Sequence, residues 1–244
     1  MYYHLADHIY ITQFKKEYIL LNAKLDKYVV CSSKISNIFE EIFSRENLYF
    51  SQHNSSTSQD LKFNHIQKLL NKNIIEYNNQ PYPYYIDRKI NSNGVTNVDW
   101  KLPLKNKNNK INLQVILALK NLIKIHMHMK IKGFYATIKL LKKFHKLQVN
   151  YIIPQREELD NLANIVNDAC MIYPTRTKCL EWAMTFVLMA LKRNWKCNLE
   201  IGLQNYPFMA HAWVECDGKV VRDSPNLREE MAIILNEPFR RAII

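Results

Sequence analysis

The sequence predicts an α+β protein whose strands and helices come in two successive groups. Near the amino terminus, short aromatic and β-branched segments alternate with turns, and segments of helical periodicity follow them. Near the carboxyl terminus the order is reversed, because a long apolar helical run precedes two strands joined at Asp217-Gly218. With 244 residues, 48% of them hydrophobic, the chain is long enough for one large domain or two small ones.

The first 80 residues contain three predicted strands and two predicted helices. The strands are expected at 9–11, 18–21 and 28–30, where β-branched and aromatic residues lie between turn residues. Apolar residues at helical spacing predict one helix over 34–44. A second helix is expected to begin at the capping pattern Thr57-x-x-Asp60 and to carry apolar residues as far as Leu70.

A polar stretch separates this first group from the second. Gln80-Pro81-Tyr82-Pro83 stops the first group, and residues rich in Asn and Lys continue to Asn109. We therefore predict a first domain over 1–82, a linker over 83–110 and a second domain over 111–244.

The second domain begins with predicted helices over 111–130 and 134–147, divided by Gly133, and another over 157–171. The pair His126-x-His128 suggests a metal site at first sight. Residues two apart on a helix point in different directions, however, and no carboxylate lies nearby in the sequence. Only 4 glycines occur and no Gly-rich phosphate loop is present. We therefore expect neither a metal nor a cofactor.

Cys179 is expected in the first turn of a buried helix over about 178–194. The run from Leu180 to Leu191 is almost entirely apolar and too long for a strand, and Thr177 is the predicted N-cap. The helix dipole and the free N–H groups of a first turn favour an anion, and hence a thiolate. Glu181 opposes this effect if it points the same way.

The register of the following hairpin decides whether His211 and Asp223 can meet. A two-residue turn at Asp217-Gly218 would set His211 opposite Ser224 and place Asp223 on the other face of the sheet. A three-residue loop would set His211 opposite Asp223, and it would also bring unlike charges together further along the strands. We therefore predict the three-residue loop.

A thiol, an imidazole and a carboxylate in this arrangement form a nucleophile, its base and the group that orients the base. A helix-start cysteine packed on a sheet that carries His and Asp is the layout of papain-like and transglutaminase-like enzymes. We therefore predict catalytic roles for Cys179, His211 and Asp223. Asp223 has an alternative role as the cap of the helix that follows it.

Four segments carry a more specific resemblance: Cys179-Leu180, Leu199-Glu200-Ile201-Gly202, the run Ala-His-Ala-Trp-Val-Glu over 210–215 and Asp-Ser-Pro-Asn-Leu-Arg over 223–228. They resemble the leader peptidases of lasso-peptide biosynthesis, the transglutaminase-like "B proteins", most clearly over 155–235. The resemblance implies a cysteine peptidase that removes the leader of a ribosomally made antibiotic precursor before macrocyclisation. It also implies association with an asparagine-synthetase-like cyclase.

The amino-terminal arrangement of three strands followed by helices resembles the small winged-helix domain that recognises leader peptides in many peptide-modifying systems. Such a domain binds the leader as an added strand. The resemblance implies that Tyr28, Val29, Val30 and Cys31 form the binding edge, with the helix face over 59–70 beside them.

Two other functions remain open from the sequence. A transglutaminase or N-acyltransferase would use the same trio but pass the acyl group to an amine. A winged-helix nucleic-acid-binding protein would agree with the net charge of +12 and the pI near 9.4. The helix over 59–72 offers only Lys62, Lys68 and Lys72, however, and the lysines are spread along the chain. We therefore expect no nucleic-acid partner.

The cysteines at 31, 170, 179, 197 and 216 are odd in number and include no Cys-x-x-Cys pair. This pattern indicates a reducing compartment and argues against a disulfide framework. The sequence contains neither a signal-peptide pattern nor an apolar run of 18 residues. We therefore expect a cytoplasmic protein without a membrane span.

Overall fold

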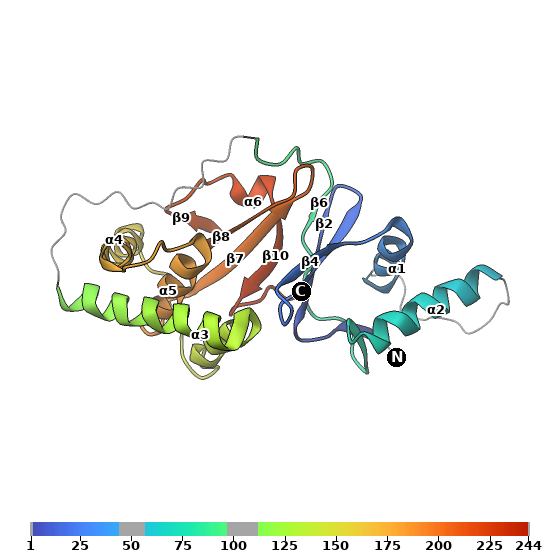
Figure 1. Ribbon diagram of the computed structural model, residues 1–244, viewed down its shortest axis with the longest axis horizontal. Coiled ribbons are helices and arrows are strands. Elements are labelled where there is room, and N and C mark those ends of the chain that lie inside the picture. The colour runs from blue at the N-terminus through green and yellow to red at the C-terminus, as the bar shows by residue number, and fades with distance from the viewer. Residues whose placement is uncertain (1, 44–56, 97–111, 244) are drawn as a thin grey trace.

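The computed structural model describes residues 2–43, 57–96 and 112–243 and confirms the α+β fold class. The amino-terminal elements and the carboxyl-terminal elements form two groups that lie side by side, each with its own four-stranded sheet (Figure 1). The sheets contact each other mainly through β10 (Ala232–Glu237) and β2 (Ile9–Phe14).

The amino-terminal sheet is an antiparallel meander with one short parallel strand added. Its strand order is β4-β3-β2-β6, with β3 at Glu17–Asn22, β4 at Lys27–Val30 and β6 at Arg88–Lys89. The helices are α1 (Ser33–Phe43) and α2 (Thr57–Asn71). The three predicted strands and two predicted helices are thereby confirmed. The pairing of β1 (Tyr2–Leu5) with β5 (Ile75–Asn78) was not predicted.

In the described part of the chain, three long helices and one short helix accompany the carboxyl-terminal sheet, whose order is β10-β7-β8-β9. The helices are α3 (Leu113–Phe144), α4 (Arg156–Ile172), α5 (Cys179–Leu191) and α6 (Leu227–Glu230). The other strands are β7 (Cys197–Gln204), β8 (Met209–Cys216) and β9 (Lys219–Val221). As predicted, α3 breaks at Gly133, whose φ of 83° lies in the left-handed region.

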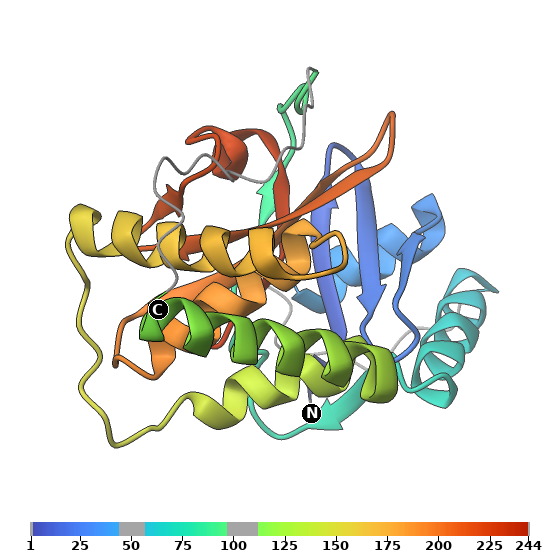
Figure 2. The same cartoon turned by 60° about the vertical axis from the view of Figure 1, so that its left-hand side comes forward.

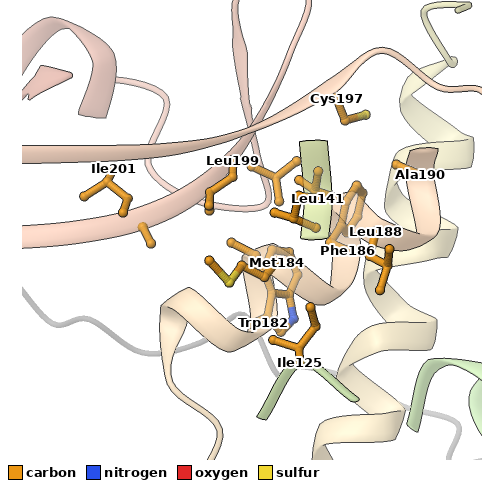
Figure 3. Close-up of a cluster of buried hydrophobic side chains, with 14 of the residues drawn as sticks. Ile125, Leu141, Trp182, Met184, Phe186, Leu188, Ala190, Cys197, Leu199 and Ile201 are labelled. Atoms are coloured by element: carbon orange, nitrogen blue, oxygen red, sulfur yellow. The ribbon is translucent and has the colours of Figure 1, made fainter. Parts of the chain in front are cut away.

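The helix α5 is the centre of the carboxyl-terminal group. Every residue from Glu181 to Leu191 is buried, as expected for a helix that is apolar on all sides. Its side chains pack between those of α3 and β7, including Ile125 and Leu199 (Figure 3). This packing fixes the amino-terminal end of α5, where Cys179 lies, against β8.

The first part of the predicted linker packs onto the carboxyl-terminal group. The Tyr85 N–H donates to the Arg241 carbonyl at 3.0 Å, and Asp87 Oδ2 accepts from the Ile233 N–H at 2.8 Å. Residues 83–96 therefore contact both groups, because Arg88 and Lys89 also form β6 of the amino-terminal sheet, whereas 97–110 fall outside the described residues. The domain limits at 82 and 111 stay predictions.

Among the described residues, no helix is both long enough and apolar enough to cross a membrane.

Candidate active site

Cys179 is the first residue of α5, as predicted, but the cap differs from the prediction. Lys178, not Thr177, is the N-cap, and its N–H donates to Glu181 Oε2 at 2.9 Å. The other oxygen of Glu181 lies 2.9 Å from His126 Nδ1 on α3. Glu181 therefore links the start of α5 to the backbone before it and to α3.

The predicted three-residue hairpin loop was wrong. Cys216 lies opposite Lys219, so β8 and β9 are joined by the two residues Asp217 and Gly218, at φ 50° and 79°. Two residues at positive φ form the turn whose twist matches the strands it joins, and Asp-Gly is among its preferred sequences. That local preference outweighs the charge pairing that favoured the longer loop.

Asp223 nevertheless reaches His211. The pairing of β9 with β8 ends at Val221, and Arg222 adopts a left-handed conformation with φ 57°. After this reversal, Asp223 Oδ2 lies 2.7 Å from His211 Nε2. The other oxygen of Asp223 accepts the Ser224 N–H at 2.8 Å. The contact that motivated the prediction is present, although the register used to predict it was wrong.

The thiol of Cys179 hydrogen-bonds to the ring of His211. Because Nε2 is engaged by Asp223, Nδ1 is the nitrogen left for the thiol. Burial raises the pKa of Cys179. His211 and the N–H groups of Ala212 and Leu180 lower this pKa by more than burial raises it, so the net pKa lies below its ordinary value.

His211 is shifted in the complementary direction. Burial lowers its pKa, but the hydrogen bonds to Asp223 and to Cys179 raise it to about 9. A lowered thiol pKa beside a raised imidazole pKa favours the thiolate–imidazolium ion pair near neutral pH. This ion pair is the reactive form of a cysteine nucleophile.

An open cavity of about 880 Å³ lies over the three side chains. Its walls come from three parts of the chain: the segment that leads into α5, the start of β8 and the end of β9. Arg222 lies on this wall and was not predicted as a residue of the site. Its identity as a charged residue next to Asp223 gave no indication of its backbone conformation.

The four other cysteines lack this environment. Burial raises the pKa of Cys31 to about 12 and that of Cys170 to about 11. Cys197 and Cys216 lie opposite each other on β7 and β8, and their buried thiols share a hydrogen bond. Only Cys179 combines partial exposure with an imidazole partner.

A buried carboxylate supports the strand that carries His211. Trp213 Nε1 donates to Glu200 Oε2 at 2.9 Å, and Arg228 and Arg241 each lie 3.0 Å from the same carboxylate. Burial raises the pKa of Glu200 to about 7. Its position inside an apolar, alternating strand was the sequence feature that could have identified it.

The described residues contain no group of three or more His, Cys, Asp or Glu side chains arranged to hold a metal ion. The expectation that no carboxylate lies near His126 was wrong, because the fold brings Glu181 beside it. His128 Nδ1 lies 3.1 Å from the Thr137 hydroxyl. The two histidines thus contact different partners.

Comparison with known proteins agrees with this geometry. Residues 122–236 match the model of the transglutaminase-like superfamily. They form a transglutaminase-like domain. The predicted resemblance to a transglutaminase-like family is thereby confirmed.

A curated relative is the Microcin J25-processing protein McjB of Escherichia coli, with 29% identity over 92 residues. The match covers 38% of this chain and about two fifths of the length of McjB. No solved structure matches significantly.

We predict that brief treatment with iodoacetamide near neutral pH will label Cys179 faster than any other cysteine. The reason is that a thiolate is the reacting species, and the other thiols are buried. Peptide mapping after short labelling measures the five rates. His211→Ala should slow the labelling of Cys179, and equal rates at Cys179 and Cys170 would contradict the assignment.

Proposed function

We propose that this chain is a cysteine peptidase that removes the leader of a ribosomally made lasso-peptide precursor before macrocyclisation. The observation that carries the proposal is the contact of Cys179 with His211, and of His211 with Asp223, beneath an open cavity. The name of the relative McjB, a processing protein for microcin J25, supports the substrate class.

The proposed reaction starts from the ion pair. The Cys179 thiolate attacks the carbonyl carbon of the leader–core peptide bond, and His211 gives its proton to the leaving amine. Asp223 holds the imidazole in position. Water, deprotonated by His211, then hydrolyses the acyl-enzyme. The first N–H groups of a helix have no intrahelical acceptor, so the Cys179 N–H is our candidate donor to the oxyanion.

The strand β4 is suited to take the leader as an additional strand. It is the edge of its sheet, and Val29 and Val30 are 51% and 41% exposed. The Cys31 N–H donates to the Tyr18 carbonyl of β3. Along an antiparallel edge strand, the N–H and C=O groups of alternate residues point towards the neighbouring strand and away from it. The N–H and C=O groups of Tyr28 and Val30 therefore point away from β3, to the open side.

This edge lies close to the candidate active site. The ring of Tyr28 lies 5.4 Å from that of Phe208, in the turn before β8, and Glu17 accepts hydrogen bonds from Asn205 and Tyr206 of the same turn. The hairpin of β7 and β8 reaches alongside the amino-terminal strands (Figure 2). A leader seated on β4 would therefore end near the cavity.

The electrostatics of Tyr28 agree with this closeness. Burial raises the pKa of Tyr28 to about 12, and the negative charges of Asp26 and Cys179 contribute to the increase. The helix face over 59–70 remains part of the proposed leader site on the resemblance alone.

Acyl transfer to an amine is the alternative that the transglutaminase-like domain supports. The same thioester would then be attacked by an amine rather than by water. In the favoured proposal, the freed core amine passes to an asparagine-synthetase-like cyclase that associates with this chain. The products of the reaction distinguish the two, because hydrolysis adds one water and transfer joins two substrates.

We predict that Cys179→Ala abolishes cleavage of a candidate precursor, such as a short peptide encoded beside the gene for this chain. Cys170→Ala is the matched control, because Cys170 lines the same cavity but has no imidazole partner, and it should stay within a few-fold of the native rate. Mass spectrometry of the products measures both. Full cleavage by Cys179→Ala, or joined rather than hydrolysed products, would contradict the proposal.

We predict that Val30→Pro weakens leader binding at least several-fold, because proline removes a backbone donor from the open edge of β4. Cys179→Ala should bind the leader within a few-fold of the native protein. Titration with a labelled leader peptide measures both affinities. The cleavage defect of Val30→Pro should ease at high precursor concentration, and unchanged leader affinity in this variant would exclude β4 as the binding edge.

A further inference from the structure

The backbone of Arg222 determines which way Asp223 points. In the observed register Val214 lies opposite Val221, so a regular continuation of β9 would set Asp223 opposite Ala212. Neighbouring residues of a strand face opposite sides, and Asp223 would then point away from His211. The left-handed φ of 57° at Arg222 ends the strand. Only after this reversal does Asp223 lie 2.7 Å from His211.

The side chain of Arg222 is anchored on α4. Its Nε lies 2.7 Å from Asp160 Oδ1, and its Nη2 donates to Asn164 Oδ1 at 2.9 Å and to the Asp160 carbonyl at 3.4 Å. Asp160 and Asn164 are four residues apart and share one face of the helix. The planar guanidinium can engage both at once, which fixes its direction as well as its distance.

The left-handed backbone conformation is unfavourable for an arginine. Glycine adopts this region freely, and asparagine or aspartate often do, whereas other residues are held there by their surroundings. The contacts with α4 supply such surroundings. The pairing of β9 with β8 holds the chain up to Val221, so this pairing and the contacts with α4 together fix residue 222.

We propose that Arg222 is a positioning residue, which through its anchorage on Asp160 and Asn164 holds Asp223 against His211. This inference deepens the proposed peptidase function and rests on it for its catalytic meaning. The charge state of His211 then depends on a contact with α4 that neither the hairpin nor the helix of Cys179 provides.

The pKa of His211, followed by NMR in the full chain, tests the proposal without a peptide substrate. Asp223→Asn measures the full effect of losing the carboxylate, which is a fall in the pKa of His211 towards its ordinary value.

Arg222→Ala should also lower the pKa of His211, by about one unit, which corresponds to a tenfold weaker hold on the proton. Asp160→Ala combined with Asn164→Ala should do the same while leaving residue 222 unchanged. Arg222→Lys, which can reach Asp160 but cannot engage both partners, should restore part of the shift.

Arg88→Ala is the matched control. Arg88 is 30% exposed, close to the 32% of Arg222, and it forms a comparable ion pair with Glu40 at 2.6 Å in the amino-terminal group. It should lower the melting temperature without changing the pKa of His211. The proposal is overturned if Arg222→Ala and the double variant keep the native pKa while Asp223→Asn lowers it, or if Arg88→Ala lowers it equally. No peptide is cleaved in this titration, so it tests the positioning role of Arg222 separately from the peptidase function. Failure of one proposal is therefore distinguishable from failure of the other.

Discussion

The contact between the Cys179 thiol and the His211 imidazole is the interaction on which the candidate site depends. Burial alone would raise the pKa of the thiol and lower that of the imidazole, so that both groups would be neutral. The pair reverses both tendencies because each charge lies beside the other, and because Asp223 lies beside His211. Raising the pKa of His211 from 6.5 to about 9 corresponds to a preference of roughly 3 kcal/mol for the charged ring.

The fold holds the two partners from opposite sides. Cys179 begins a helix whose remaining residues from Glu181 are buried, and His211 lies on a strand between two others. Behind His211, Trp213 is fixed by Glu200, and a methyl group on Gly202 would overlap the Trp213 ring. Groups on buried, regular elements keep a fixed separation better than groups on loops do. A nucleophile and its base require such a fixed separation.

Local sequence patterns predicted the elements but not the way that they meet. The long, almost entirely apolar run predicted α5 and the place of Cys179 in it, and the turn signal at Asp217-Gly218 predicted the hairpin that carries His211. The register predicted for the hairpin at Asp217-Gly218 was wrong. The turn preference of Asp-Gly competed with charge pairing between the strands, and charge pairing was the weaker of the two. The left-handed conformation of Arg222 was not predicted, and the contacts of its side chain with α4 join segments that no local pattern connects. The closeness of Tyr28 to the site likewise results from the packing of two groups far apart in sequence.

The ion pair can be measured directly as the pH dependence of thiolate absorbance in the ultraviolet, with Cys179→Ala subtracted to remove the other thiols. The account predicts that one thiolate appears below the ordinary thiol pKa of 9.0. In His211→Ala the same step should move to higher pH, because only the N–H groups of Ala212 and Leu180 then remain to oppose burial. A native protein whose Cys179 ionises only above 9.0, unaffected by the loss of His211, would contradict the account.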